Sequence, residues 1–171
     1  MLRLLFASIF ILLSACSSLP SGQPQDWQWQ LTGRAVFQSP EQRDSANILW
    51  QSAPGRDSVQ LSGPFGQGAV RLIADGDGAS LWSDGELRAS DSSIEALLSQ
   101  QLNWRVPVEQ LREWVRGNGA SDDAATLSER QFEQDGWRVA QSKFNADGLP
   151  RKVVIERPPY KLTLLIAKWT P

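Results

Sequence analysis

The chain of 171 residues contains no histidine and a single cysteine, Cys16, and these two absences exclude several kinds of site. Without histidine it cannot build a Ser-His-Asp or Cys-His catalytic group. One cysteine cannot complete a zinc site made of Cys and His ligands. Basic residues are not in excess either, because 17 Lys and Arg stand against 19 Asp and Glu. Nucleic-acid binding, which needs a dense basic face, is therefore disfavoured, and carboxylate chemistry or a binding function remains.

The N-terminal segment has the pattern of a lipoprotein signal. A short basic start is followed by an apolar run of roughly ten residues over 4–13, which is too short to span a bilayer. The run ends in Leu13-Ser14-Ala15-Cys16, which resembles the bacterial lipobox. We therefore expect residues 1–15 to be a signal peptide and Cys16 to carry the lipid anchor, on the periplasmic face of the outer membrane by analogy with bacterial lipoproteins. The alternative is an apolar segment with a chance cysteine.

A polar stretch separates this signal from the rest of the chain. Residues 17–26 contain two prolines and few apolar side chains, so residues 16–26 are expected to form a lipidated N-terminus and a flexible linker. Ten flexible residues reach on the order of 18 Å. Residues 27–171 show no internal repeat and no second linker, and they predict a single domain.

Most of this domain is predicted to be antiparallel β-sheet. Apolar residues alternate from Trp27 to Phe37, which indicates a long half-buried strand, and a turn at 39–44 leads into a second one. Further short strands are predicted over 58–62, 68–74, 79–87, 132–134, 137–144, 152–157 and 160–169.

The middle of the chain changes to helical spacing. Residues 92–95 (Ser-Ser-Ile-Glu) fit a capping box, in which Ser92 caps a helix of about ten residues and Glu95 reaches back. A second short helix is expected to begin near Pro107 and to end at Gly117. The predicted class is mainly β (α+β), barrel-like in topology, with a helical insertion.

Two features of this domain leave alternatives open. A curved sheet with inserted helices either has a core filled by side chains or encloses a pocket of lipid size, and the eight tryptophans fit both. In the loop 62–68, glycines and a proline flank Phe65, so the ring either protrudes or folds under the sheet rim.

Acidic pairs such as Asp122 and Asp123 could serve a glycan hydrolase, but turn acids exposed to water are far commoner. Arg34, Arg112 and Arg116 could bind phosphate, although a solvated or salt-bridged arginine is the commoner case.

The motifs along the chain resemble those of the LolB family of outer-membrane lipoprotein receptors. The resemblance is carried, in order, by the lipobox, Leu31-Thr32-Gly33-Arg34-Ala35, Trp50-Gln51, residues 61–66, the helix start at 92–98, and the pattern Pro107-Val108-x-x-Leu111-Arg112-x-Trp114-Val115-x-Gly117. It implies an incomplete antiparallel β-barrel with a short helical lid enclosing an apolar cavity. It also implies a monomer that is not an enzyme and needs no cofactor. At Gly117-Asn118-Gly119 the chain departs from the family's usual Gly-x-Pro, which leaves the path to Thr126 open.

The resemblance also implies a task. The protein would take lipoproteins from the periplasmic carrier LolA by binding their acyl chains, and would insert them into the inner leaflet of the outer membrane without ATP. The loop Pro64-Phe65-Gly66 would protrude for membrane insertion. The predicted cavity lining is Val36, Ile48, Trp50, Leu61, Leu72 and Leu164 from strands, and Leu97, Leu98, Leu111, Trp114 and Val115 from the lid. The alternative is a structural lipoprotein that scaffolds envelope assembly, with a filled barrel and a flat interaction surface.

Overall fold

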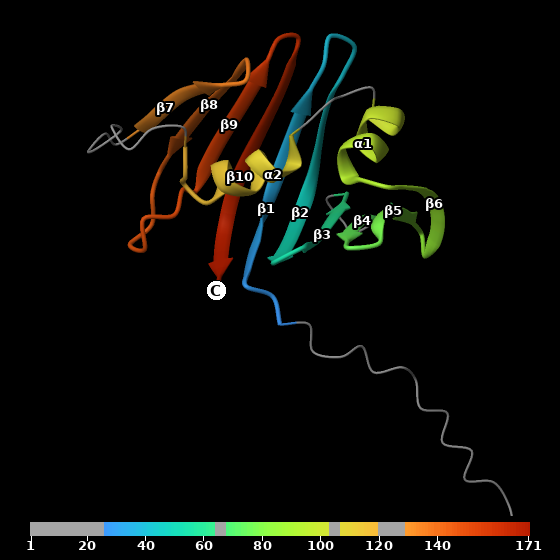
Figure 1. Ribbon diagram of the computed structural model, residues 1–171. Helices are drawn as coiled ribbons and strands as arrows, with labels where there is room; N and C mark the ends of the chain where they lie inside the picture. The colour runs from blue at the N-terminus through green and yellow to red at the C-terminus, as the bar shows by residue number, and fades with distance from the viewer. Residues whose placement is uncertain (1–25, 64–67, 103–106, 120–128) are drawn as a thin grey trace, which may run out of the picture.

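The computed structural model describes residues 26–63, 68–102, 107–119 and 129–171, and these form one curved antiparallel sheet with two short helices (Figure 1). The ten strands follow the order β6-β5-β4-β3-β2-β1-β10-β9-β8-β7. They are β1 (Trp29–Gln38), β2 (Arg43–Ala53), β3 (Arg56–Ser62), β4 (Val70–Asp75), β5 (Gly78–Ser83), β6 (Glu86–Asp91), β7 (Glu129–Gln134), β8 (Trp137–Ser142), β9 (Lys152–Arg157) and β10 (Tyr160–Thr170).

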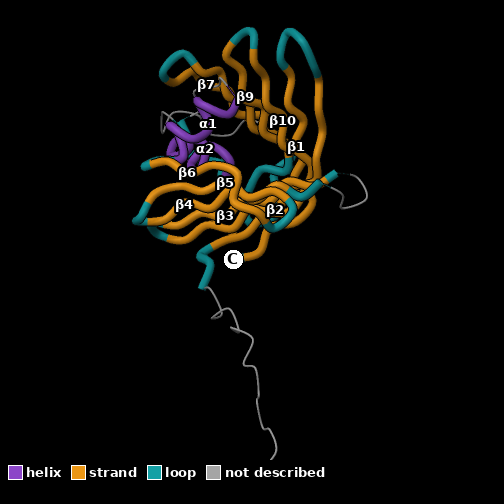
Figure 2. Tube along the Cα trace, turned by 90° about the vertical axis from the view of Figure 1, so that its right-hand side faces the viewer, coloured by secondary structure: helices purple, strands orange, loops and turns teal. Residues whose placement is uncertain are grey.

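The sheet is an incomplete barrel, as the resemblance implied. Its two outer strands, β6 and β7, do not pair with each other in the described part of the chain, so the wall stays open along one side. The helices α1 (Ile94–Leu102) and α2 (Val108–Val115) lie on one side of the curved sheet, between the β5–β6 end and the β7 end (Figure 2). None of the helices in the described ranges has the length and apolar character needed to cross a membrane.

Tight hairpins connect many of the strands, and their residues explain the antiparallel order. At Asp84 and Gly85 the φ angles are 53° and 80°, and at Asp135 and Gly136 they are 51° and 77°. Two successive residues with positive φ are typical of the type I′ turn, whose twist matches that of the strands it joins. The turn at Asp135-Gly136 connects β7 to β8, where the sequence predicts strands over 132–134 and 137–144.

The central strands β1 and β10 pair along most of their length, with one irregularity. Thr32 pairs with Lys168, but the next residue, Gly33, pairs with Ile166, so β10 carries one extra residue at this point. A Cβ atom added at Gly33 would collide with the backbone carbonyl oxygen of Leu165. Glycine is therefore required here by the close approach of two backbones rather than by a special φ angle.

Large apolar side chains fill the inner face of the sheet in two groups. The central cluster consists of Trp29, Leu31, Ile48, Trp50, Leu111, Trp114, Val115, Trp137, Val139, Val153, Ile155, Leu164 and Ile166. The lateral cluster consists of Leu72, Ala79, Ile94, Leu97 and Val108. The predicted alternation along β1 is confirmed, because Trp29 and Leu31 belong to the central cluster and Ala35 and Phe37 pack against it.

The cap of α1 differs from the prediction by one residue. The hydroxyl oxygen of Ser93, not Ser92, accepts a hydrogen bond from the backbone N–H of Ala96 at 3.1 Å. Glu95 does not reach back to the start of its own helix. Its Oε1 instead accepts a hydrogen bond from the backbone N–H of Val108 at 3.2 Å, at the first residue of α2. The capping-box interpretation was wrong because a tertiary contact to α2 uses the carboxylate that the local pattern would have used.

Candidate functional site

The helix α2 lies over the central cluster and is fixed to the sheet at its C-terminal end. The fully buried Gln141 of β8 donates from Nε2 to the carbonyl oxygens of Trp114 at 2.8 Å and Asn118 at 3.1 Å. These carbonyls belong to the end of a helix, where intrahelical partners run out. The indole N–H of Trp114 donates to Gln134 of β7 at 3.0 Å. Strands β7 and β8 therefore hold both the backbone and the largest side chain of this helix.

The same helix ends as the sequence predicts. Gly117 has φ of 97°, and its N–H donates to the carbonyl oxygen of Trp114 at 3.3 Å. The N–H of Asn118 reaches back to the carbonyl oxygen of Glu113 at 3.1 Å. This pair of bonds is the Schellman arrangement, in which a glycine adopts the left-handed conformation just beyond the helix.

An ion pair beneath α2 joins it to the opposite part of the sheet. Arg112 contacts the carboxylate of Asp57 in β3, whose side chain is 3% exposed against 27% for Arg112. The other carboxylate oxygen of Asp57 accepts a hydrogen bond from the indole N–H of Trp50 at 3.0 Å. Arg112 therefore forms a salt bridge, which is one of the commoner roles expected of it, and its guanidinium is not left free for a phosphate. Sequence analysis did not identify Asp57, because 55 positions separate the two partners.

The predicted cavity residues are brought together by the fold, with one exception. In the central cluster lie Ile48, Trp50, Leu111, Trp114, Val115 and Leu164, with Leu61 packed against it. In the lateral cluster lie Leu72 and Leu97, with Leu98 packed against it. These residues form an apolar core between the inner face of the sheet and both helices. The binding of acyl chains to this surface stays a prediction.

The exception is Val36, which does not face the interior. Its neighbours on β1, Ala35 and Phe37, pack against the central cluster, and side chains alternate between the two faces of a strand. Val36 therefore lies on the outer face, where it pairs with Ser45 of β2 and Thr163 of β10. The prediction for this residue was wrong because it went against the alternation of β1, which already places Ala35 and Phe37 on the inner face and Val36 on the outer one.

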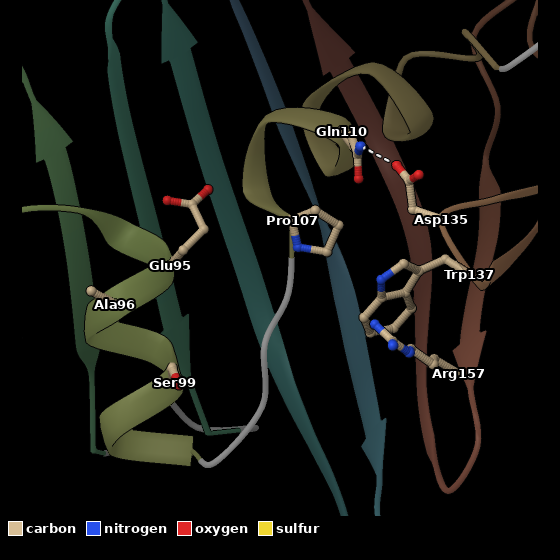
Figure 3. Close-up of a pocket in the computed structure, with 8 residues that line it drawn as sticks. All are labelled: Glu95, Ala96, Ser99, Pro107, Gln110, Asp135, Trp137 and Arg157. Carbon is tan, nitrogen blue, oxygen red and sulfur yellow. Dashed lines mark hydrogen bonds between the residues drawn. The ribbon is translucent and has the colours of Figure 1, made fainter.

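A cleft of about 580 Å³ opens between α1 and the β7–β9 side of the sheet. Its lining, named here the seam cleft, is Glu95, Ala96, Ser99, Pro107, Gln110, Asp135, Trp137 and Arg157 (Figure 3). Trp137 is 2% exposed and also belongs to the central cluster, so the cleft borders the apolar interior. Its other side chains are mostly polar or charged. None of the site residues predicted from the sequence lines this cleft, and no local motif marks it, because its members come from four separate segments of the chain.

Other predicted site residues lie outside the part of the chain that the structure describes. These are the lipidation site Cys16 and the loop residues Pro64, Phe65 and Gly66. Their roles stay predictions that rest on sequence alone.

Comparison with known proteins decides the family. A family model described as "Outer membrane lipoprotein LolB" matches residues 27–169. The chain belongs to the LolB family. A LolB from Marinomonas sp. (strain MWYL1) is 34% identical over 177 residues, which cover 93% of this chain and 92% of the relative. A LolB from Pseudomonas aeruginosa (strain UCBPP-PA14) is 34% identical over 194 residues, covering 98% and 95%. A third, from Stutzerimonas stutzeri (strain A1501), is 35% identical over 152 residues, covering 84% and 74%.

Membership of the LolB family confirms the resemblance drawn from the sequence motifs. These relatives all carry the name outer-membrane lipoprotein LolB, which agrees with the outer-membrane location predicted from the lipobox. The matched region, residues 27–169, contains every described strand and helix apart from the last residue of β10. The apolar inner face, the two covering helices and the seam cleft are therefore features of a LolB-family domain.

Proposed function

We propose that this protein receives lipoproteins from the periplasmic carrier LolA by binding their acyl chains, and inserts them into the inner leaflet of the outer membrane. The observation that carries the proposal is the apolar inner face of an unclosed barrel, which continues from the strands onto α1 and α2. An open wall gives a long chain a way in from the side, and an apolar lining provides the environment that such a chain prefers to water.

The transfer needs no ATP and no covalent step if the affinity for acyl chains rises from the carrier to the receptor and from the receptor to the membrane. Each methylene group removed from water contributes about 0.8 kcal/mol, so an acyl chain moves toward whichever apolar surface encloses it better. Every 1.4 kcal/mol of difference in binding free energy changes relative occupancy about tenfold. A receptor that binds the acyl chains better than the carrier does, and a membrane that binds them better than the receptor, would together set the direction.

The loop 64–66 is proposed to act at the last step, the delivery into the membrane. Phe65 stands between a Gly-Pro pair and a Gly-x-Gly sequence, where turn formation is favoured and neighbouring side chains are too small to cover the ring. Burial of one exposed phenyl ring in an apolar phase contributes about 1.5–3 kcal/mol. Such a contact would hold the receptor against the bilayer during release.

The first experiment mixes the domain lacking its N-terminal segment with LolA that carries a labelled lipoprotein, then separates the two proteins. The label is expected to move to this domain in the absence of nucleotide. If it stays on the carrier, and a fatty acid does not displace an apolar dye from the domain, the acyl-chain proposal is refuted and a scaffold role is favoured.

The second experiment separates acceptance from delivery. Phe65→Glu is expected to accept the label normally but to release it poorly into phospholipid vesicles, because a charged side chain does not enter the bilayer interface. Phe65→Leu, the matched control, keeps an apolar side chain and should deliver nearly as well as the unmutated protein. Normal delivery by Phe65→Glu would contradict the role assigned to the loop.

A further inference from the structure

The seam cleft lies where the two halves of the barrel wall face each other. On one side is α1, which packs against β5 and β6 and contributes Glu95 and Ser99. On the other side are the β7–β8 turn with Asp135 and the end of β9 with Arg157. Figure 3 shows the side chains of the two sides facing one another across the cleft, with Pro107 of the α2 start between them. The cleft is thus a mostly polar hollow that borders the apolar interior at the buried Trp137.

Gln110 supplies an acceptor whose direction is fixed. Its Nε2 donates to the carboxylate of Asp135 at 2.7 Å, and since a carboxylate can only accept, the amide cannot be turned round without losing this bond. Its Oε1 is buried and receives no hydrogen bond from any residue in the described ranges. Figure 3 shows this oxygen turned away from Asp135, toward the side where Pro107 and Trp137 lie. A buried acceptor without a donor is unfavourable, and a ligand N–H or O–H would relieve it.

Arg157 supplies a donor across the same cleft. Its guanidinium lies 5.7 Å from the ring centre of Trp137, and none of the described carboxylates is within ion-pair distance of it. The stacked guanidinium keeps N–H groups that can donate to a carbonyl oxygen. The cleft therefore presents an acceptor and a donor above a floor of apolar core.

We infer that the seam cleft binds the peptide segment that joins the acylated cysteine of a cargo lipoprotein to its folded part. The inference rests on the proposed function. If the acyl chains lie inside the barrel, the folded part of the cargo stays outside it, and the connecting chain has to cross the wall. An extended peptide offers backbone N–H and carbonyl groups, which suit Gln110 Oε1 and Arg157 respectively.

The charges of the cleft favour a peptide over a phospholipid headgroup. Two carboxylates, Glu95 and Asp135, line it beside a single guanidinium from Arg157. A phosphate would be repelled by both carboxylates, whereas neutral amide groups are not. The cleft would then distinguish lipoproteins from the phospholipids that surround this protein, although both carry similar acyl chains.

The test compares two ligands on the full chain: palmitate, and a tripalmitoylated cysteine bearing a five-residue uncharged peptide. Gln110→Leu removes the acceptor, and it is expected to weaken lipopeptide binding about five- to tenfold, as for the loss of one hydrogen bond, while palmitate affinity stays within about twofold. The matched control is Gln100→Leu, because Gln100 lies on α1 and likewise donates to an aspartate, Asp91, but does not line the cleft. It should change neither affinity.

A second variant keeps the test valid if Gln110→Leu folds poorly. Arg157→Gln is expected to lower lipopeptide affinity selectively in the same way. An unchanged ratio of lipopeptide to palmitate affinity in both variants overturns the inference and leaves acyl-chain binding intact. Competition by phosphatidylglycerol as strong as that by the lipopeptide also overturns it. Failure of the unmutated protein to bind either ligand would instead refute the proposed function itself, and the inference with it.

Discussion

The buried ion pair between Asp57 and Arg112 predicts an unequal response to removal of its two members. Asp57 is almost completely enclosed, and its remaining partner is the indole N–H of Trp50. Arg112 is partly exposed, so water can solvate its guanidinium if the partner is lost. The substitution Arg112→Met therefore leaves a carboxylate buried with one neutral donor, whereas Asp57→Asn leaves an arginine with access to solvent.

The magnitudes follow from this difference in exposure. An uncompensated buried charge typically costs about 3–5 kcal/mol, which is the expected loss of unfolding free energy for Arg112→Met. Asp57→Asn keeps the shape of the side chain and the acceptor for Trp50, so its expected cost is about 1.5 kcal/mol, near the lower limit for a hydrogen bond to a charged group. The double variant removes both charges and should be more stable than Arg112→Met alone by about 2 kcal/mol.

Urea unfolding of the purified domain, followed by tryptophan fluorescence, measures all three free energies. The slopes of the unfolding transitions should stay equal, which shows that the compactness of the two end states is unchanged. The reasoning is refuted if Arg112→Met costs less than about 1 kcal/mol, or if Asp57→Asn is the more damaging of the two. Either result would mean that the carboxylate of Asp57 is well solvated without its arginine.

Two further predictions concern backbone geometry. Gly33→Ala should lower the unfolding free energy by about 3 kcal/mol, at the upper end of overpacking costs, because the added methyl group would collide with the carbonyl oxygen of Leu165. Gly76→Ala is its control, since a Cβ there meets nothing within 4 Å. If thermal or urea unfolding shows that both variants lose the same unfolding free energy, the collision at Gly33 is contradicted. Ser93→Ala should cost about 1 kcal/mol as the loss of a helix cap. Ser92→Ala should leave stability nearly unchanged, and the opposite order would restore the original capping assignment.

The strands could be predicted largely because their signals are local. Alternating apolar residues and Asp-Gly turns depend on only a few neighbouring positions. They indicate β1 and the hairpin of β7 and β8. The stripe Val108, Leu111, Trp114 and Val115 likewise marked the buried face of α2. The assignment of Val36 to the interior failed because it went against this signal, since the alternation that puts Ala35 and Phe37 inside puts Val36 outside.

The polar contacts of the site could not be predicted, for a different physical reason. Asp57 and Arg112, or Gln141 and Trp114, meet only because distant strands and helices are packed together. Glu95 shows that such a contact can also override a local pattern, since its carboxylate bonds to α2 rather than to its own helix. The partners in such tertiary hydrogen bonds are far apart in the sequence, and no local pattern of residues predicts that they pair.

The two helices belong to different parts of the sheet, and this has a mechanical consequence. α1 packs against β5 and β6, while α2 is hydrogen-bonded to β7 and β8, and the described polar contact between the helices is the bond from Val108 to Glu95. A change in the width of the interior therefore also acts on the packing of Val108 against α1 residues and on the ion pair of Arg112 with Asp57 in β3. The free energy needed to admit a second or a longer chain would be set by these contacts, by the hydrogen bond from Val108 to Glu95 and by the bending of a continuous sheet, and together they would limit the bulk of the cargo that the barrel can hold.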